Sequence, residues 1–278
     1  MDLLSGSYSR MEGSMAGLFQ VLWGRSDGTF KKAAVLNGAD DKPLIIPSKN
    51  DDDVVESICT RPTAVDWDGD GDLDLVVGNF AGKFYLFLGE GRGRFAPTAH
   101  LIKAGDDPLK IKGHHGDPFV VDWDGDGDLD LLSGSDQGGV QWAENTAGPK
   151  KTPELKPFRD LIAAPAEVKW ECRPEEVTAP AGSTRVWAAD VTGDGKLDIL
   201  VGDNISLISP AKGVSDEEFV RRRKEWQEKM AAARKETDGV EDSEKLKPIM
   251  ERINKLYEQK KEFMNEDRTG FVWLYVRK

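Results

Sequence analysis

Short apolar segments recur along the chain, each bounded by glycine, aspartate or proline. They are four to eight residues long and rich in Val, Leu, Ile, Phe and Trp, which is typical of β-strands rather than helices. The segments fall into groups that follow one another in the same order. The pattern therefore predicts an all-β fold built from repeated small sheets.

An acidic loop follows the first strand of each group. The loop reads DWDGDGDLD at residues 66–74 and again at 122–130, and DVTGDGKLD at 190–198. One apolar run directly precedes each loop, and another, ending in the letters VVG, LSG or LVG, directly follows it. Each loop is therefore predicted to join two neighbouring strands.

Two further strands are expected after the first two loops. A glycine-led third run occupies residues 82–89 and 138–145, and a fourth run occupies 94–102 and 157–164. Four strands in a repeat of about 40–60 residues are typical of propeller blades. One such sheet cannot bury both of its faces, so neighbouring blades must pack against it.

Both ends of the chain match the middle of this repeat. Residues 2–6 match a second strand, 17–24 a third and 29–36 a fourth, while 269–278 match a third strand. We therefore expect a β-propeller of about four four-stranded blades with incomplete terminal blades. The chain would then be a piece of a longer propeller; alternatively, the terminal blades share one sheet and close a four-bladed ring.

A segment of different composition interrupts the last repeat. Residues 214–268 contain almost no glycine, begin with a capping box from Ser215 to Glu218, and carry apolar residues at steps of three and four. This spacing predicts two helices paired as an antiparallel hairpin. The expected domains are propeller blades over 1–213, the inserted hairpin over 214–268, and a returning propeller strand over 269–278.

Charge is unevenly divided between the blades and the hairpin. Residues 215–268 carry 15 acidic and 14 basic residues, whereas the rest of the chain carries 35 acidic and 24 basic ones. The net charge of −12 argues against nucleic acid as a partner, because phosphate binding requires a basic surface. The hairpin is either a partner-binding arm or a decoration whose apolar stripes pack on each other or on the blades.

The acidic loops have the composition of a cation site. In DWDGDGDLD, acids occupy positions one, three, five, seven and nine, and glycine occupies position six. Alternate carboxylates on a curled loop converge on one point, and glycine permits the left-handed backbone that the curl requires. Such an oxygen cage suits Ca²⁺, and repulsion among the acids couples metal binding to loop ordering. An EF-hand would need flanking helices and Glu at position twelve, which is instead Val77, Ser133 or Val201.

The stretches VDWDGDGDLDLVVGN, VDWDGDGDLDLLSGS and AADVTGDGKLDILVGD resemble the FG-GAP/VCBS repeat family, the calcium-loop β-propellers of integrin heads and many bacterial surface or secreted proteins. The resemblance covers residues 2–205 and 269–278. It implies two strong calcium sites and a weaker third, in which Thr192 replaces an acid. The implied metal-binding residues are Asp66, Asp68, Asp70, Asp72 and Asp74; Asp122, Asp124, Asp126, Asp128 and Asp130; and Asp190, Thr192, Asp194, Lys196 and Asp198, with Asp72, Asp128 and Lys196 offering backbone carbonyls.

Other residues with distinctive chemistry are few. His114, His115 and Asp117 precede a predicted first strand and form either a transition-metal or acid–base cluster or a purely structural loop. Cys59 and Cys172 lack metal-ligand spacing and are interpreted as two buried thiols, with one disulfide as the alternative. The sequence contains no nucleophile elbow, phosphate-binding glycine loop or zinc motif.

The expected function is an extracellular binding or adhesion module in which calcium is structural and the partner is an unknown protein or glycan. The expected location is secreted, periplasmic or at the cell surface, although the chain carries no signal peptide and no apolar run that spans a bilayer. A propeller-based polysaccharide lyase or hydrolase is the less favoured alternative. A scaffold that recruits a partner through residues 214–268 is another.

Overall fold

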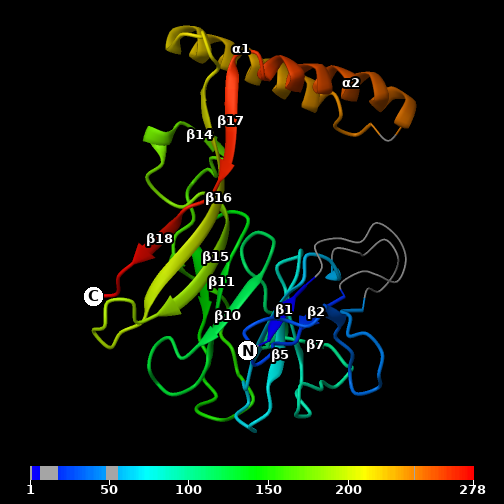
Figure 1. Ribbon diagram of the computed structural model, residues 1–278, viewed down its shortest axis with the longest axis vertical. Helices are drawn as coiled ribbons and strands as arrows, with labels where there is room; N and C mark the ends of the chain where they lie inside the picture. Colours follow the sequence, from blue (N-terminus) through cyan, green and yellow to red (C-terminus); the bar gives the residue numbers. More distant parts are fainter. Residues whose placement is uncertain (1, 7–17, 48–55, 241) are drawn as a thin grey trace. The chain divides into compact units, whose positions relative to one another are not determined.

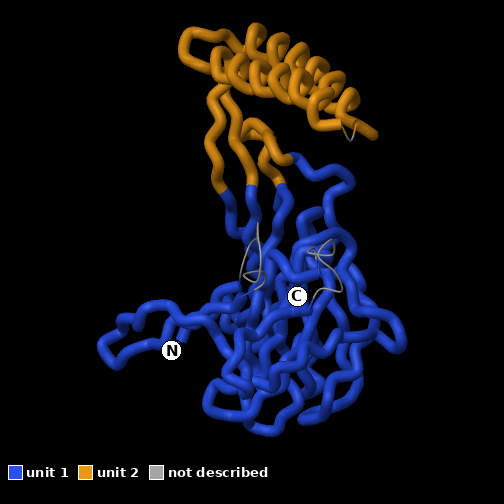
Figure 2. Tube along the Cα trace, turned by 90° about the vertical axis from the view of Figure 1, so that its right-hand side faces the viewer, with its two compact units in different colours: residues 1–169, 179–204, 270–278 blue, residues 170–178, 205–269 orange. Residues whose placement is uncertain are grey.

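The computed structural model describes residues 2–6, 18–47, 56–240 and 242–278. The chain divides into two compact units, which Figure 2 shows in different colours. Unit 1 contains most of the strands, and unit 2 contains both long helices (Figure 1). Unit 1 comprises Met1–Lys169, Ala179–Asn204 and Gly270–Lys278, and unit 2 comprises Trp170–Thr178 and Ile205–Thr269.

Unit 1 is built from antiparallel sheets whose neighbouring strands largely follow chain order. The first sheet contains β1 (Leu3–Ser5), β2 (Gln20–Leu22) and β3 (Ala34–Val35). The second contains β4 (Arg61–Val65), β5 (Asp74–Gly78), β6 (Phe84–Phe87) and β7 (His100–Leu101). The third contains β10 (Asp117–Val121), β11 (Asp130–Gly134), β12 (Val140–Ala143) and β13 (Arg159–Ile162). The prediction of repeated antiparallel sheets is thus confirmed.

The fourth sheet of unit 1 is formed around a long strand. In it, β15 (Gly182–Ala189) and β18 (Val272–Tyr275) both pair antiparallel with the first half of β16 (Asp198–Pro210). A small ribbon of β8 (Lys103–Ala104) and β9 (Asp107–Pro108) lies after the second sheet in the chain. The returning strand predicted near the C-terminus is therefore β18.

Hydrophobic clusters pack each sheet of unit 1 against the next. In β5 every residue is buried, because Leu75 and Val77 face the first sheet while Val76 faces the third. In β11, Leu131 and Leu132 likewise point to opposite clusters, as the two-residue period of a strand requires. A strand covered on both faces needs a continuous apolar sequence, which explains the runs after each acidic loop.

The three clusters connect the four sheets in chain order. Trp142 of the third sheet joins Val186 and Ile199 of the fourth in the last of these clusters. Among the described residues, no such cluster joins the fourth sheet back to the first, and the strands form no closed sheet. Closure of a four-bladed ring therefore stays a prediction.

Unit 2 consists of a three-stranded base and a helical hairpin. In the base, β14 (Glu171–Cys172) pairs parallel with the second half of β16, and β17 (Met264–Thr269) pairs antiparallel with it. The helices are α1 (Asp216–Lys235) and α2 (Ser243–Lys260), and a short 3-10 helix covers Pro174–Glu176. Unit 2 is therefore larger than residues 214–268, because β16 continues the sequence LDILVGD into NISLISP as one strand.

Local signals and apolar packing account for the helical hairpin. The Ser215 side chain accepts a hydrogen bond from the backbone N–H of Glu218 and so caps α1. Between the helices a cluster buries one side of each, and a second cluster packs the start of α1 against β16 and β17. These clusters contain Met230, Ala233, Ile253 and Leu256, and Ile208, Phe219, Phe263 and Met264, respectively. Both predicted apolar stripes are thus covered mainly within unit 2.

No helix in the described ranges is long and apolar enough to cross a membrane. The side chains of Cys59 in unit 1 and Cys172 in unit 2 are both buried thiols. Burial raises the pKa of Cys59 and so keeps this thiol in its neutral form.

Candidate metal centre

Each acidic loop joins the first two strands of a sheet. The loops begin after Val65, Val121 and Ala189, each of which pairs with the aspartate at position nine of its loop. Strands therefore flank all three loops, and the EF-hand is excluded by the structure as well as by the sequence.

The first aspartate of each loop holds the loop in its curl. One carboxylate oxygen accepts a hydrogen bond from the backbone N–H of the glycine at position six, five residues later. That glycine has a positive φ in every loop, where a side chain would be strained. The donor–acceptor distances are 3.1 Å for Gly71 to Asp66, 3.1 Å for Gly127 to Asp122 and 2.9 Å for Gly195 to Asp190.

Two of the loops bring three carboxylates together. In each of these clusters, one oxygen from every carboxylate lies within 4.8 Å of the others. Carboxylate oxygens at this spacing suit a hard cation, and Ca²⁺ tolerates irregular oxygen cages best. The clusters consist of Asp66, Asp68 and Asp70 in the first loop, and Asp122, Asp124 and Asp130 in the second.

Unsatisfied oxygens show that these loops fit a cation. Oδ1 of Asp66 and Oδ1 of Asp128 are buried, and neither has a hydrogen-bond partner in the described part of the chain. A buried carboxylate oxygen without a partner is costly. A bound cation would remove that cost at Asp66, which belongs to the first cluster.

The aspartate at position nine has a structural task. Oδ2 of Asp130 accepts a hydrogen bond of 3.0 Å from the N–H of Trp123, and Oδ1 accepts one of 2.7 Å from the N–H of Asn145 after β12. Asp74 accepts the equivalent hydrogen bonds from the backbone N–H groups of residues 67 and 89. Asp198 accepts them from those of residues 191 and 277. This residue thus ties the loop to the third strand of its sheet.

The metal-binding residues predicted from the sequence are therefore distributed between two roles. Asp130 belongs to the second carboxylate cluster and also ties its loop to the third strand, whereas Asp74 makes only the latter contacts and lies outside the first cluster. Asp126 lies outside the second cluster, and its Oδ1 instead accepts a hydrogen bond from the N–H of Asp128. The sequence pattern does not distinguish these roles, because both need an acid at a fixed spacing from the turn.

Burial disfavours the charged forms of three acids in the second loop, Asp124, Asp128 and Asp130. Burial raises the pKa of Asp130 to about 6, and hydrogen bonds from Asn145 and Trp123 only partly oppose this. The pKa values of Asp124 and Asp128 are also raised, first by burial and then by neighbouring carboxylates. At Asp198 the hydrogen bond from the N–H of Arg277 instead lowers the pKa. A cation among the acids of the second loop would favour their charged forms.

The third loop differs from the other two. Oδ1 of Asp190 accepts hydrogen bonds from Gly193 at 2.6 Å and Asp194 at 3.1 Å. Position three is Thr192, and no three-carboxylate cluster forms among the described residues of this loop. The basic side chain of Lys196 adds a positive charge to the same loop.

The tryptophans of the first two loops are packing residues. Trp67 is 3% exposed, and its ring nitrogen donates a 2.9 Å hydrogen bond to the carbonyl of Leu129 in the second loop. Trp123 is 6% exposed, and the guanidinium of Arg277 lies 4.8 Å from its ring centroid. Trp67 therefore connects two successive acidic loops.

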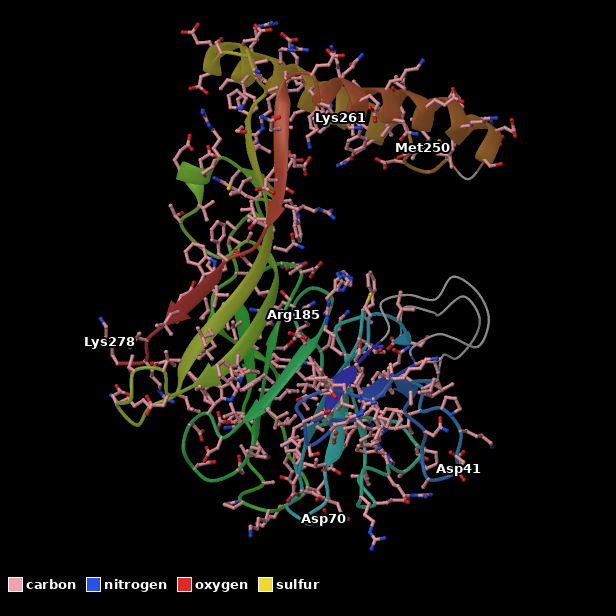
Figure 3. All side chains as sticks on the ribbon, viewed as in Figure 1. Asp41, Asp70, Arg185, Met250, Lys261 and Lys278 are labelled. Atoms are coloured by element: carbon pink, nitrogen blue, oxygen red, sulfur yellow. The ribbon has the colours of Figure 1, made fainter. Side chains whose placement is uncertain are left out.

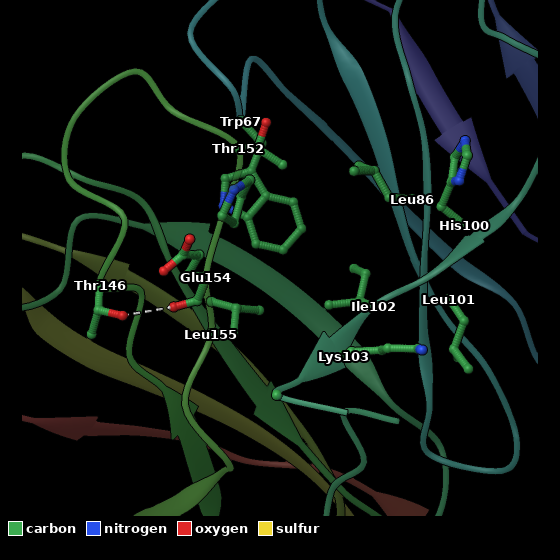
Figure 4. Close-up of a pocket in the computed structure, with 12 residues that line it drawn as sticks. Trp67, Leu86, His100, Leu101, Ile102, Lys103, Thr146, Thr152, Glu154 and Leu155 are labelled. Atoms are coloured by element: carbon green, nitrogen blue, oxygen red, sulfur yellow. Dashed lines mark hydrogen bonds between the residues drawn. The ribbon is translucent and has the colours of Figure 1, made fainter. Parts of the chain in front are cut away.

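Trp67 lines a cavity of about 500 Å³. Figure 4 shows the side chains around it. Its lining combines apolar side chains such as Leu86 and Ile102 with the charged residues Lys103 and Glu154. Two lining residues are joined by a hydrogen bond: Oγ1 of Thr146 donates to the backbone carbonyl of Glu154 at 3.0 Å. The lining residues come from sequence-distant strands and loops, so no local motif predicts the cavity.

The histidine loop does not form a three-ligand metal cluster within the described ranges. Nδ1 of His114 lies 3.4 Å from Oδ2 of Asp136, and the ring of His115 packs edge-on against Phe80 with centroids 4.7 Å apart. Asp117 instead lies between Arg61 and Arg185. Sequence reasoning overlooked these two arginines, although both stand five residues before the first aspartate of an acidic loop.

Residues 66–133 match the model of the FG-GAP-like repeat. The matched segment extends from the first acidic loop into β11 and therefore contains both three-carboxylate clusters. This match confirms the family resemblance over that part of the chain. No curated protein matches the chain.

Proposed function

We propose that the protein is a calcium-stabilised β-propeller module. The observation that carries the proposal is the pair of carboxylate clusters in successive loops of the FG-GAP-like repeat. Calcium bound there would join the ends of β4 and β5, and of β10 and β11, at the turns where repulsion among acids is greatest. Its role would be structural, and the third loop would bind more weakly.

The stacking of the sheets supports a propeller arrangement. The second and third sheets of unit 1 each bury one face against the preceding sheet and the other against the following one. A terminal sheet in such a row leaves one face to be covered by a further blade. We therefore propose that the sheets of unit 1 are blades, with unit 2 as an insertion between the second and third strands of the last one.

The calcium sites also support an extracellular role. Extracellular calcium modules bind at about 10⁻⁴ to 10⁻³ M, and clusters of only three carboxylates, which give incomplete oxygen cages, fit that range. We propose that the module is secreted, periplasmic or at the cell surface and binds a protein or glycan partner. The acidic surface would exclude polyanionic partners.

Calorimetry and thermal unfolding of the full chain test the calcium proposal. Isothermal titration of metal-free protein with calcium should give two equivalents of stronger binding. Saturation at about 100 times the dissociation constant contributes about 2.7 kcal/mol for each site, which raises the unfolding midpoint by roughly 5–10 °C. No measurable binding at millimolar calcium, together with an unchanged midpoint, would exclude the proposal.

A further inference from the structure

The first two acidic loops are in contact with each other across neighbouring sheets. They meet at the end of unit 1 at which Figure 3 shows Asp70. Trp67 stands between two aspartates of the first cluster, and its ring nitrogen donates to the carbonyl of Leu129, which precedes Asp130 of the second cluster. The ring is buried in one hydrophobic cluster with Leu131 of the third sheet. A side chain of the first loop is thus fixed in the sheet that carries the second loop.

Asn145, which follows β12, donates to the same carbonyl. Its Nδ2 lies 3.1 Å from the Leu129 oxygen, and its backbone N–H donates a 2.7 Å hydrogen bond to Asp130. Its side-chain oxygen accepts a 2.9 Å hydrogen bond from the N–H of Glu154, which fixes the orientation of the amide group. One carbonyl oxygen of the second loop therefore receives a donor from the first loop, through Trp67, and another from Asn145.

The residues that follow Asn145 pack on both loops, and we call residues 145–150 the bridging segment. The N–H of Gly148 donates a 2.8 Å hydrogen bond to Asp128 in the second loop. Two residues later, Lys150 lies against the first loop, where a β-carbon at Gly69 would be 2.5 Å from Cβ of Lys150 and 2.6 Å from its Cα. Lys150 adopts a φ of 55°, which costs energy in a residue other than glycine. The segment thus spans the two loops in a strained conformation.

The close approach of the bridging segment at Gly69 is an addition to the loop structure. Gly125 and Gly193 have the same position in the second and third loops, and both also adopt a positive φ. No described atom lies within 4 Å of a β-carbon built at either of them. The loop itself therefore requires a left-handed glycine, whereas only the bridging segment requires close contact at Gly69.

Two residues next to this connection have unsatisfied oxygens. Oδ1 of Asp66, beside Trp67, and Oδ1 of Asp128, beside Leu129, are buried without a hydrogen-bond partner in the described part of the chain. A cation in the first cluster would satisfy Asp66 and so order the loop around Trp67. Because the ring of Trp67 is bonded to the second loop, ordering of one loop restricts the other. The second loop then loses less entropy when it binds its own cation.

Charge acts in the opposite direction. A cation in one loop makes the potential at the other loop less negative and so disfavours a second cation. Each of the two loops contains five aspartates and keeps a formal charge of −3 after it binds one divalent cation. Each loop therefore remains strongly attractive to cations, and about 0.15 M salt screens exposed charges beyond about 8 Å. The shared ordering then outweighs the repulsion between the cations.

We propose that Trp67 and the bridging segment join the first two acidic loops into one binding unit, in which calcium bound to either loop raises the calcium affinity of the other. Trp67 acts as a positioning residue that transmits order between the loops through Leu129. The inference rests on the proposed function, because it requires calcium at both clusters. Coupling between two sites is typically about 5–150-fold in affinity.

A nuclear magnetic resonance titration of the full chain with calcium chloride, in about 0.15 M sodium chloride, measures each loop separately. The amide of Gly71 reports the first loop and that of Gly127 the second, because each donates to the first aspartate of its own loop. Asp124→Asn removes a carboxylate of the second cluster and should raise the calcium concentration at the Gly71 midpoint by roughly 2–10-fold. Asp68→Asn should raise the Gly127 midpoint by a similar factor, because coupling is reciprocal.

Trp67→Phe separates the connection from the direct effect of charge. This substitution keeps an apolar ring but removes the donor to Leu129, so the effect of Asp124→Asn on the Gly71 midpoint should fall by about half or more. Trp123→Phe, at the same position of the second loop, is the matched control, because the Trp123 ring nitrogen donates no hydrogen bond among the described residues. A purely structural role for Trp67 would lower calcium affinity and leave the effect of Asp124→Asn unchanged.

The outcomes distinguish this inference from the proposed function. Titration at both loops with no effect of Asp124→Asn on Gly71 would overturn the coupling and leave the calcium sites intact. No titration of either amide up to about 10 mM calcium would exclude both. Should Trp67→Phe fail to fold, hydrogen exchange of the Trp67 ring N–H provides the test. In Asp68→Asn, calcium at the second loop should slow this exchange by roughly threefold or more, and an unchanged rate would contradict the coupling.

Discussion

Gly134, the last residue of β11, lies directly against the backbone of Thr184 in β15. A β-carbon at position 134 would be only 2.2 Å from the Thr184 carbonyl oxygen. The neighbouring Ser135 and Thr184 exchange backbone and side-chain hydrogen bonds of 2.9–3.2 Å. The end of one sheet thus meets the start of the next without room for a side chain. Gly78 and Gly116 make the same approach one sheet earlier.

Gly134→Ala should therefore destabilise the protein by about 2–3 kcal/mol, because two backbones must separate. Gly202 occupies the equivalent position of β16, yet a β-carbon there would lie 3.8 Å from its nearest neighbour, Cβ of Arg185. Gly202→Ala is thus the matched control and should change stability by less than about 0.5 kcal/mol. Denaturant unfolding of the two variants makes the comparison; equal losses would contradict the packing described.

Asp68→Asn should weaken calcium binding at the first loop by about tenfold or more, because a charged ligand of the cluster becomes a neutral one. Stability without calcium should stay within about 0.5 kcal/mol of the parent protein or rise, since repulsion in the loop decreases. Calorimetric titration measures the affinity. Asp106→Asn, in the exposed turn between β8 and β9, removes the same charge outside the loops and should leave both properties unchanged.

Thr192→Asp should strengthen the third calcium site. The substitution places an acid at position three of the loop, where the other two loops carry the clustered residues Asp68 and Asp124. The number of stronger calcium equivalents in a titration should then rise from two to three. Thr192→Asn, which has a similar shape without the charge, serves as the control. A variant that still binds only two equivalents would show that more than Thr192 weakens this loop.

An ion cluster around a buried lysine should make unit 2 sensitive to acid. Nζ of Lys260 lies 2.6 Å from Glu171 and 2.8 Å from Glu266. Burial disfavours the charged form of Lys260, but hydrogen bonds to the two glutamates outweigh it and raise its pKa. The hydrogen bond from Lys260 is the main cause of the lowered pKa of Glu266.

Because the folded-state pKa of Glu266 is below its unfolded value, its contribution to stability is present above about pH 4.5 and is lost as the pH falls further. Helical circular dichroism during thermal unfolding should show this loss. Lys260→Met should cost about 1–2 kcal/mol near neutral pH, because the charge-assisted hydrogen bonds to two partly exposed glutamates are lost, and should flatten the acid dependence. The neighbouring Lys261 is exposed, so Lys261→Met should do neither. An unaltered acid transition in Lys260→Met would assign the sensitivity to other groups.

Much of the fold is predictable because its signals are local. The acidic loops, the apolar runs around them and the capping box at Ser215 each act within about ten residues, so periodicity and turn chemistry suffice. The curl of the first loop is of the same kind, since Gly71 and Asp66 are only five residues apart. The family match over residues 66–133 rests on these local features as well.

Other features depend on contacts between distant segments, which no local pattern encodes. The letters LDILVGD predict a strand that ends in a turn, but pairing with β14 and β17 extends β16 to Pro210. Asp130 is an acid at the correct spacing for a metal ligand. Only the position of Asn145 shows that its carboxylate also holds the loop to the third strand of its sheet. Arg61 and Arg185 are 124 positions apart in the sequence, and their relation to Asp117 exists only when three strands lie together.

The sequence alone thus determined the repeated sheets, the helical hairpin and the chemistry of the acidic loops, because side-chain period and turn residues act over short distances. Only the tertiary structure decided that Gly134 is a packing residue while Gly202 is not, that Asp130 lies in a carboxylate cluster while Asp74 does not, and that two arginines share one aspartate. These outcomes depend on which strands become neighbours, and burial and close approach between neighbours arise only once the sheets have packed.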